Sequence, residues 1–523
     1  MGEAMRALDV AIIVLFLVGM PLLGVWIAGR QRSATDYFVS ERRISWWVVC
    51  VSVVSAETST LTVLSVPTVA YLGTMTFLSL AVGYLIGRIV VSFVLLPKYI
   101  AGELITAYGF LGKRFGRNIQ STASLTFLVT RLLADGLRLF ATAIPIKVVL
   151  VAYGVDVSYW VIVAALGVAM VVYSFLGGVR AVVWVDAIQM LWYVIGAFAV
   201  ILVLNGKLPD GWFASAADAG KFQVLDFDAS AFTSPYAIVV AFIGGAVLSM
   251  ASHGADQLIV QRLMATKDVR AAQKALIASG VVVFLQFALF LFIGVMLWAF
   301  YKAANPVTDL KLNNNDELFA NFIVNDMPSG LSGFVIAGIL AAALSSSLGA
   351  LASSTVTDIV QRVVRRPMSE AEVFKQGRIW TVVWAGLLIV CAGLFATLTR
   401  RGNPIVEQGL SIAGFTYGAL LGAFLLGLVF RKAKELDAIV AFAVTVVVMA
   451  FVILGVKFVG PEARMVIDFA PAAPARKFVS LAYPWYTVLG VLVTLVVGGL
   501  MSLRHKGYQP PGVQDDVMSA KAS

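Results

Sequence analysis

Residues 46–73 read WWVVCVSVVSAETSTLTVLSVPTVAYLG, an apolar stretch interrupted at its middle by hydroxyl and acidic side chains. About 20 apolar residues are enough to cross the hydrocarbon core of a bilayer, so this stretch is long enough to span one. Polar groups at that depth normally face a protein interior or a water-filled cavity. The stretch therefore predicts a membrane-spanning helix that unwinds near its centre.

A second stretch, residues 237–257, has the same character and reads AIVVAFIGGAVLSMASHGADQ. Its glycine pair, Gly244 and Gly245, is followed by Ser249, Ser252 and His253. Spans that are interrupted at matching positions of two inverted repeats are typical of transporter binding sites. Alternatively, the hydroxyls bond to their own helix and the glycines allow close helix packing.

The whole chain is as apolar as these two stretches. Of its 523 residues 60% are hydrophobic and only 13% are charged, with a mean hydropathy of +0.91. A typical soluble protein carries about 25% charged residues, so this composition excludes a soluble enzyme and a nucleic-acid binder. The formal net charge of +10 is explained by the excess of Lys and Arg in cytoplasmic loops of membrane proteins. Cys50 and Cys391 both lie in apolar runs and His505 lies in a polar tail, so a disulfide framework and a zinc or haem enzyme are disfavoured.

We predict an all-α integral membrane protein with about thirteen spanning helices. The predicted spans are 8–29, 46–72, 75–98, 119–150, 158–177, 181–204, 234–256, 275–301, 331–353, 378–399, 404–430, 435–456 and 484–503. Basic residues concentrate in every second connection, which places the N-terminus outside and the C-terminus in the cytoplasm. Arg262 is assigned to one of these cytoplasmic connections. Longer connections at 205–233, 302–330 and 457–483 are expected to be caps or lids.

Two halves of five spans each account for the positions of the two interrupted stretches, because an odd number of spans inverts the second half. Residues 46–204 and 234–430 form these halves, separated by an extracytoplasmic loop at 205–233. A leading helix with its cytoplasmic connection occupies 1–45, two trailing helices occupy 431–503, and a cytoplasmic tail occupies 504–523. Both interrupted helices are then the first of their half.

Charged residues within the fourth span mark a second candidate for the solute site. Arg131, Asp135 and Arg138 are spaced by four and three residues, which places them on one face of a helix. Two arginines against one aspartate leave an uncompensated positive charge, and Arg matches the geometry of a carboxylate. The segment could therefore bind an acidic or polyhydroxylated solute, or form an ion triad that satisfies itself. Arg88 in the third span is expected either to snorkel or to pair internally, and not to contact the solute.

Four stretches resemble the sodium/solute symporter family, whose members have the LeuT-type inverted-repeat fold. They are SAETSTLTVLSVP at 55–67, YSFLGGVRAVVWVDAIQ at 173–189, GADQLIVQRLMATKDVRAAQKA at 254–275 and AGILAAALSSSLGALASSTVTD at 337–358. The resemblance extends from about residue 36 to about residue 484. It implies a sodium:solute symporter that imports a small polar solute by alternating access.

The resemblance also implies a sodium site. In this family two backbone carbonyls of the first core helix, here at about Val51 and Val54, and two hydroxyls of the eighth hold one ion. A match without gaps puts Ala342 and Ala343 at the hydroxyl positions. Methyl groups cannot replace the water of a hard cation.

Three explanations remain open for this departure from the family pattern. A register shift would let Ser345 and Ser346 serve, a remodelled site could use Asp186, or sodium coupling at this site is lost. Asp186 matches an acidic residue of the family near the ion route, although it could also be a salt-bridge anchor to Arg180. A proton-coupled or ion-independent transporter is the alternative function.

The expected solute pocket combines polar residues of both interrupted spans with the charged helix face. His253 could be a hydrogen-bonded structural residue or a pocket residue, and Glu57 could line the outer vestibule. The amide and aromatic groups used by sugar-carrying relatives are not found at Ser249 and Ser252. The predicted substrate-binding residues are Ser52, Ser55, Glu57, Thr58, Arg131, Asp135, Arg138, Ser249, Ser252 and His253.

No nucleophile with a neighbouring base and no metal motif is evident, so a membrane-embedded enzyme is disfavoured. A sensor built on a transporter body would need a signalling domain, which the tail is too short to provide. The expected partners are a small-molecule solute, the bilayer and Na⁺, without an organic cofactor or nucleic acid. The solute and the oligomeric state stay undetermined at this stage.

Overall fold

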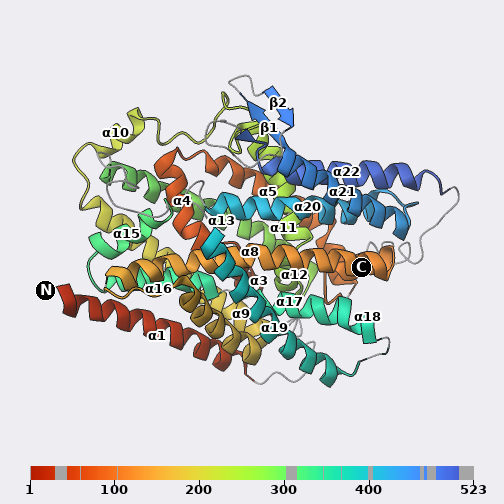
Figure 1. Ribbon diagram of the computed structural model, residues 1–523, viewed down its shortest axis with the longest axis horizontal. Coiled ribbons are helices and arrows are strands. Elements are labelled where there is room, and N and C mark those ends of the chain that lie inside the picture. Colours follow the sequence, from red (N-terminus) through yellow and green to blue (C-terminus); the bar gives the residue numbers. More distant parts are fainter. Residues whose placement is uncertain are drawn as a thin grey trace.

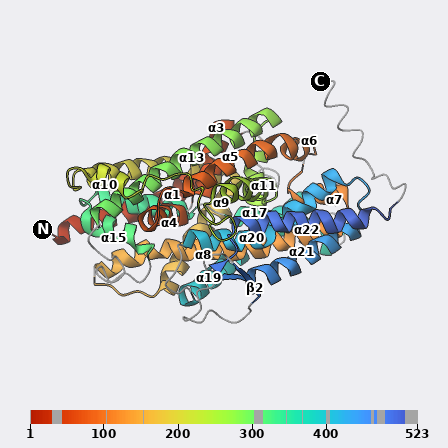
Figure 2. The ribbon, with the colours of Figure 1, turned by 90° about the horizontal axis from the view of Figure 1, so that it is seen from above.

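A computed structural model gives the arrangement of the chain (Figure 1). It describes residues 2–29, 44–58, 60–102, 104–152, 154–301, 315–344, 347–364, 366, 368–398, 405–459, 464–467 and 479–505. Long helices run side by side along the long axis, and α10 and α15 lie at the end of the bundle that also holds the N-terminus (Figures 1 and 2).

The elements of the first half are nearly all helical. They are α1 (Gly2–Ala28), α3 (Trp46–Glu57), α4 (Thr60–Leu72), α5 (Phe77–Val94), α6 (Leu96–Ala101), α7 (Tyr108–Arg114), α8 (Arg117–Ala152), α9 (Tyr159–Asn205) and α10 (Trp212–Asp218). The helical assignment of α9 continues through the connection predicted at 178–180. Its two apolar parts, Tyr159–Val172 and Val179–Asn205, correspond to the two spans predicted there.

The second half begins with a π-helical turn. Its elements are η2 (Val240–Gly244), α11 (Gly245–Gly254), α12 (Gln257–Met264), α13 (Val269–Phe300), α15 (Glu317–Asp326), α16 (Leu331–Leu344), α17 (Leu348–Ser354), η3 (Thr355–Val360), α18 (Gln361–Val364), α19 (Glu370–Leu398) and α20 (Ile405–Val429). The last elements are α21 (Glu435–Gly455), β1 (Val456–Val459), β2 (Arg464–Ile467), β3 (Val479–Ser480) and α22 (Pro484–Ser502).

Every predicted span overlaps a helix. Eight helices in the described part of the chain are long and apolar enough to cross a membrane, or nine if the bent pair formed by α3 and α4 counts as one. Shorter apolar helices at Tyr159–Val172, Val240–Gly254 and Leu331–Leu340 and the charge-bearing α8 occupy the other predicted spans. The exact number of thirteen membrane spans stays a prediction.

Large apolar side chains point outward along the periphery of the bundle. Leu15 and Trp26 of α1 are 74% and 79% exposed, whereas Phe127, Phe290 and Phe424 in the middle of the bundle are fully buried. In water such exposure would be costly, but lipid chains are as apolar as these side chains. The outer surface is therefore suited to a bilayer.

Both predicted interruptions are confirmed. The axes of α3 and α4 differ by 59° across a break next to Thr58. The second break separates α11 from α12 at Ala255 and Asp256, and the Asp256 carboxylate accepts a hydrogen bond of 2.8 Å from the amide of Leu258. Hydroxyl and carboxylate side chains favour such ends because they replace backbone partners.

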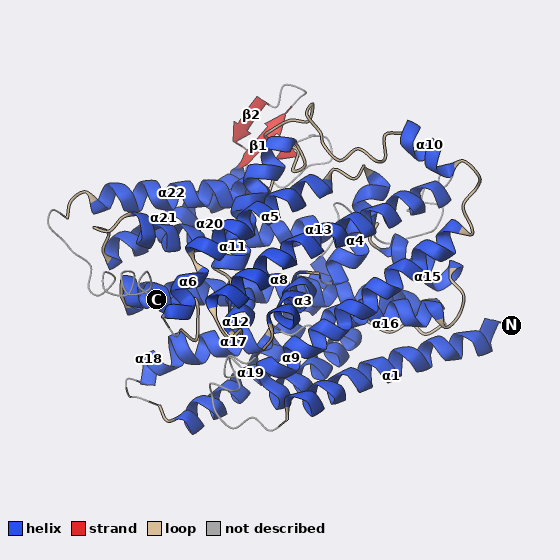
Figure 3. Ribbon diagram, turned by 180° about the vertical axis from the view of Figure 1, so that it is seen from behind, coloured by secondary structure: helices blue, strands red, loops and turns tan. Residues whose placement is uncertain are grey.

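A small antiparallel sheet forms in the connection predicted at 457–483, with the order β2-β1-β3 (Figure 3). Phe458 of β1 stacks on Phe232, with 6.0 Å between the ring centroids. The amide of Ala482 donates a hydrogen bond of 2.8 Å to the carbonyl of Phe232. The sheet thus covers the connection that leads into η2.

Another connection, the one that contains α10, is fastened to the end of α4 by Lys221. Its ammonium group donates to the carbonyls of Tyr71 at 2.8 Å and Gly73 at 2.7 Å and lies 5.1 Å from the ring centre of Trp298. The last carbonyls of a helix have no intrahelical donor, so a cation at this position stabilises the helix end. Burial lowers the pKa of Lys221 below its ordinary value.

Asp9 attaches the leading helix to α16. Its Oδ1 accepts hydrogen bonds from the amides of Gly330 at 2.7 Å and Gly333 at 2.8 Å, and its Oδ2 accepts one of 3.2 Å from Ser329 Oγ. A carboxylate at this position satisfies amide groups that the first turn of a helix leaves without acceptors.

We expect Asp9→Ala to destabilise the protein by about 1–3 kcal/mol, because two amides lose their acceptor in a buried contact. The thermal midpoint of the purified protein should fall by a few degrees, and Asp9→Asn should have a smaller effect because it keeps one acceptor oxygen. An unchanged midpoint for Asp9→Ala would show that α1 is not held by this contact.

Candidate functional site

A cavity of about 150 Å³ lies where the two helix breaks meet. The end of α3 contributes Ala56 and Glu57 to its wall, and the second break contributes Ser252, His253 and Asp256. The apolar part of the wall is formed by Phe77, Tyr84, Leu248, Phe287, Val406 and Leu410. The two interrupted segments, far apart in the sequence, therefore line the same chamber.

Glycines of α5 allow α11 to approach closely enough to form this chamber. A Cβ on Gly87 would collide with the backbone carbonyl of Ala246, and one on Gly83 would lie too close to Ala241. Ser249 in the same contact donates a hydrogen bond of 2.8 Å to the carbonyl of Tyr84. The position of the second break relative to α5 is thereby set by direct backbone packing.

The carbonyl groups at the end of α3 obtain partners from other helices. The carbonyl of Ala56 accepts from Nη1 of Arg138 at 3.1 Å. Thr62 donates to the carbonyl of Glu57 at 3.4 Å. The break is thus stabilised by side chains of α4 and α8.

Glu57 connects the two breaks. Its carboxylate forms an ion pair with Arg88 of α5, and its Oε2 lies 3.5 Å from Nε2 of His253 in α11. Arg88 is fully buried and also donates to Ser279 at 3.0 Å. Internal pairing, one of the two alternatives expected for Arg88, is confirmed, and Glu57 brings no unpaired negative charge to the cavity.

His253 is held by its own helix. Its Nδ1 lies 3.1 Å from the carbonyl of Ser249 and 2.8 Å from Oγ of Ser252. With the Ser252 hydroxyl donating to Nδ1, the proton on Nε2 is directed toward the Glu57 carboxylate. His253 therefore lines the cavity and bridges the two broken helices at the same time.

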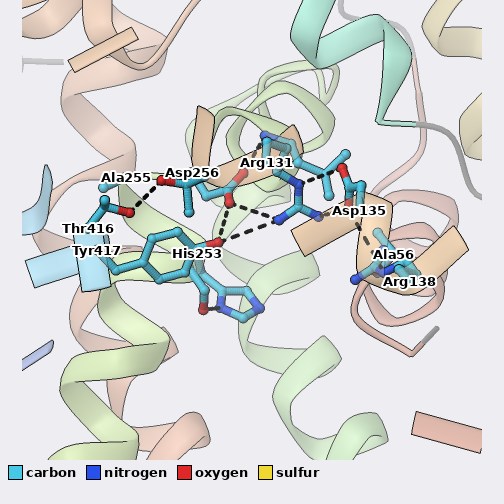
Figure 4. Close-up of polar contacts among 12 residues, drawn as sticks. Ala56, Arg131, Asp135, Arg138, His253, Ala255, Asp256, Thr416 and Tyr417 are labelled. Atoms are coloured by element: carbon cyan, nitrogen blue, oxygen red, sulfur yellow. Dashed lines mark hydrogen bonds and ion pairs between the residues drawn. The ribbon is translucent and has the colours of Figure 1, made fainter. Parts of the chain in front are cut away.

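Arg131 lies between two carboxylates at the floor of the cavity (Figure 4). It donates to Asp135 from Nε at 3.0 Å and from Nη2 at 3.1 Å, and its Nη1 lies 3.1 Å from Oδ2 of Asp256. Tyr417 of α20 donates to the same Asp256 oxygen. The predicted charge excess is therefore wrong for Arg131, because Asp256 is a second counterion that approaches from a distant part of the chain.

Arg138, one turn further along α8, has fewer partners. Its Nη1 bonds to the carbonyl of Ala56, and its Nε is 4.0 Å from Oδ1 of Asp135. Among the residues that the structure describes, Nη2 has no hydrogen-bond acceptor, and the side chain is 18% exposed and lines the cavity. A guanidinium group with free donors in a chamber of this size can bind a carboxylate through two parallel hydrogen bonds.

Asp186 is on α9 and does not line the cavity. It is fully buried, and its Oδ2 accepts from Nη2 of Arg262 at 2.8 Å and from Ser52 at 3.1 Å. The anchor suggested at Arg180 is wrong, because the partner is Arg262, and Arg180 is exposed. Arg262, which was predicted in a cytoplasmic connection, belongs to the short helix α12, and its side chain is buried.

The structure describes some, but not all, of the residues predicted to bind sodium. Val51 and Val54 lie within α3, about two turns and one turn before the break. Ser345 and Ser346 lie outside the described residues. Ala342 and Ala343 belong to α16, which ends at Leu344. The assignment of these residues to an ion site stays a prediction.

Five of the ten residues predicted to bind the solute line the cavity, namely Glu57, Arg131, Arg138, Ser252 and His253. The other five, Ser52, Ser55, Thr58, Asp135 and Ser249, are buried around it, and the Thr58 hydroxyl donates to Oε1 of Gln286 at 2.8 Å. Sequence reasoning missed Asp256 and Tyr417 as site residues. The position of Asp256 directly after the second break was the available signal, whereas Tyr417 had none.

A sequence model of the sodium:solute symporter family matches residues 37–445. The sodium/sialic acid symporter NanT of Aliivibrio fischeri is 27% identical over 518 residues, which cover 97% of this chain and 95% of NanT. The sodium/sialic acid symporter SiaT of Proteus mirabilis is also 27% identical, over 84% of this chain and 88% of SiaT.

The solved structure of a Na⁺-coupled sialic acid symporter, in a substrate-bound outward-open state, has a similar fold. The TM-score is 0.81 with 23% identity, and the match covers 96% of this chain and 98% of the other. The LeuT-type fold expected from the four sequence stretches is therefore confirmed.

Proposed function

Since this chain belongs to the sodium:solute symporter family, we propose that its cavity binds an organic carboxylate and that the chain carries this solute together with Na⁺. Sodium-coupled secondary transport itself follows from the family and from its relatives. The carboxylate is the proposed part. It is supported above all by the Arg138 guanidinium group, whose free donors face the cavity.

The chemistry of the wall limits the solute further. The donors of Arg131 are taken up by Asp135 and Asp256, so Arg138 is the arginine of the wall that keeps donors for a solute carboxylate. Ser252, Thr62 and the hydroxyl groups of tyrosines offer hydrogen bonds, while aromatic side chains would cover the apolar body of a solute. Sialic acid, the solute named for both relatives, is a carboxylated sugar and is the first compound to test.

Access to the cavity is proposed from the end of the bundle where α5 and α20 begin. Phe77 and Val406, in the first turns of these helices, are part of the wall. On the opposite side, the buried pair of Asp186 and Arg262 lies beyond the part of α12 that lines the cavity. If the N-terminus is outside the cell, as the distribution of basic residues predicts, this is an outward-facing state of an alternating-access cycle.

Uptake into proteoliposomes tests this proposal. An imposed Na⁺ gradient should drive accumulation of radiolabelled sialic acid or of a short monocarboxylate, and each acid should compete where its amide does not. Equal competition by acid and amide, or preference for a neutral sugar, would contradict a carboxylate solute.

Restoring the hydroxyl groups typical of the family should strengthen sodium coupling if the usual ion geometry is kept. We expect Ala342→Ser combined with Ala343→Ser to lower the Na⁺ concentration for half-maximal uptake several-fold, because hard cations prefer oxygen ligands. The measurement is the Na⁺ dependence of initial uptake rates. No change would indicate that Na⁺ is held elsewhere in this chain.

A further inference from the structure

A line of polar side chains runs along the contact between α3 and the second part of α9. Ser52, Ser55 and Thr58 follow one another at intervals of three on α3. Asp186, Gln189 and Tyr193 follow at intervals of three and four on α9, so each set lies on one helix face. The two helices pack against each other, and all six side chains are buried.

The side chains of α3 approach those of α9 and α13 at both ends of this line. Ser52 donates to Asp186 at 3.1 Å, and the Tyr193 hydroxyl faces Thr58 and Gln286. The spacing on both helices places Ser55 at the level of Gln189, between these two contacts.

This middle level has polar atoms without partners. Neither Oγ of Ser55 nor the amide oxygen and nitrogen of Gln189 has a hydrogen-bond partner within the described part of the chain. Both side chains have zero exposure. Buried polar groups normally find partners, and leaving several of them unsatisfied at one place is costly. Packing between α3 and α9 alone would be satisfied by apolar side chains, so these polar groups indicate a ligand.

Helix α13 adds Gln286 to the same place. Its Oε1 accepts from Thr58 at 2.8 Å, while its amide nitrogen has no partner among the described residues. The two ends of a glutamine amide are assigned from the network, so turning this amide would direct its oxygen inward and its nitrogen to the Thr58 hydroxyl. The Tyr193 hydroxyl likewise has no hydrogen bond of ordinary geometry to a described residue.

We propose that a sodium ion binds between α3, α9 and α13 and is coordinated by oxygens of Ser55, Thr58, Gln189, Tyr193 and Gln286. Several neutral oxygens from separate helices are the ligands that a hard cation prefers. Asp186 lies one turn from Gln189 and Glu57 is next to Thr58, but each of these carboxylates is already paired with an arginine, so the ion would be held by the neutral oxygens.

The proposal rests on the sodium coupling of the proposed function and gives the ion a place that does not involve positions 342 and 343. It also links the ion to the solute. Thr58 is the residue at the break after α3, and Ala56, which holds Arg138, lies two residues before it. An ion at Thr58 orders the chain end that positions the guanidinium group.

Equilibrium binding of ²²Na⁺ to the purified full-length protein, measured without any solute, tests the site independently of the carboxylate proposal. Gln189→Leu should raise the half-saturating Na⁺ concentration at least about tenfold or remove one bound ion per chain. Gln189→Glu should lower that concentration, because a carboxylate strengthens a cation site. A purely structural role of the amide would not produce this opposite pair of effects.

Ser65→Ala is the matched control for Ser55→Ala. Ser65 on α4 is also a buried serine whose hydroxyl has no partner among the described residues, but it is not part of the line. Ser55→Ala should weaken Na⁺ binding, and Ser65→Ala should leave it unchanged. If Gln189→Leu does not fold, Tyr193→Phe, which removes one oxygen, should weaken binding in its place.

Folded Gln189→Leu and Tyr193→Phe proteins with wild-type Na⁺ affinity and stoichiometry would overturn the site. Weaker binding by Gln189→Glu would also overturn it. A wild-type protein that binds no Na⁺ would contradict sodium coupling as well, whereas loss of carboxylate transport with intact Na⁺ binding would contradict only the proposed solute.

Discussion

Replacing Arg138 by alanine should reduce the uptake of an organic carboxylate at least about thirtyfold, because truncating one partner of a buried charge pair typically costs about 2–5 kcal/mol. The guanidinium group reaches the cavity with Nη2 free among the described residues, and Ala56 at the first break keeps it in place. The measurement is the initial rate of carboxylate uptake at saturating Na⁺, together with the affinity for the solute.

Two further variants separate the role of Arg138 in binding from its role in packing. Arg138→Lys keeps the charge but loses the two parallel hydrogen bonds, so uptake should recover only in part. Lys147→Ala on the same helix removes a cation that pairs with the exposed Asp156 and should leave uptake unchanged. Uptake by Arg138→Ala at the wild-type rate would rule out this residue as the carboxylate ligand.

The second large effect is expected at the pair of Asp186 and Arg262. Asp186→Asn leaves a buried arginine without its counterion, and breaking such a pair by removing one partner costs about 3–5 kcal/mol. We expect loss of Na⁺-driven uptake and a much lower thermal midpoint. Both should be measured on the same purified protein.

The double variant Asp186→Asn with Arg262→Gln separates stability from coupling. Removing both charges should restore most of the thermal stability, since buried pairs are often replaceable by neutral groups. Na⁺-driven uptake should stay impaired if the pair takes part in coupling. Neutralising the exposed pair of Arg366 and Glu372 in the same way should change neither property. A double variant with wild-type Na⁺ dependence would remove the pair from the mechanism.

The architecture was readable from the sequence because its signals are local. A run of six polar or small residues in a long apolar stretch, as at 55–60, predicts a broken span without knowledge of any neighbour. The same holds for the intervals between Arg131, Asp135 and Arg138, which depend only on helix geometry.

The electrostatics of the site could not be read in this way, because they depend on which helices meet. Asp256 is 125 residues from Arg131, and Tyr417 is 161 residues from Asp256. Counting basic residues along the chain placed Arg262 in a cytoplasmic connection, but such a count cannot distinguish an arginine in water from one buried against a carboxylate. The orphaned amide of Gln189 likewise becomes visible only when α9 is seen packed on α3.

The hydrogen bonds from Lys221 to the end of α4 offer a way to observe the transport cycle. Because this ammonium group holds the final carbonyls of α4, any tilt of that half-helix must drag the neighbouring loop with it. Phe227 on the same loop is 72% exposed, so Phe227→Cys would provide an accessible thiol for a spin label. Distances from a label there would report the swing of a helix that is itself hidden inside the protein.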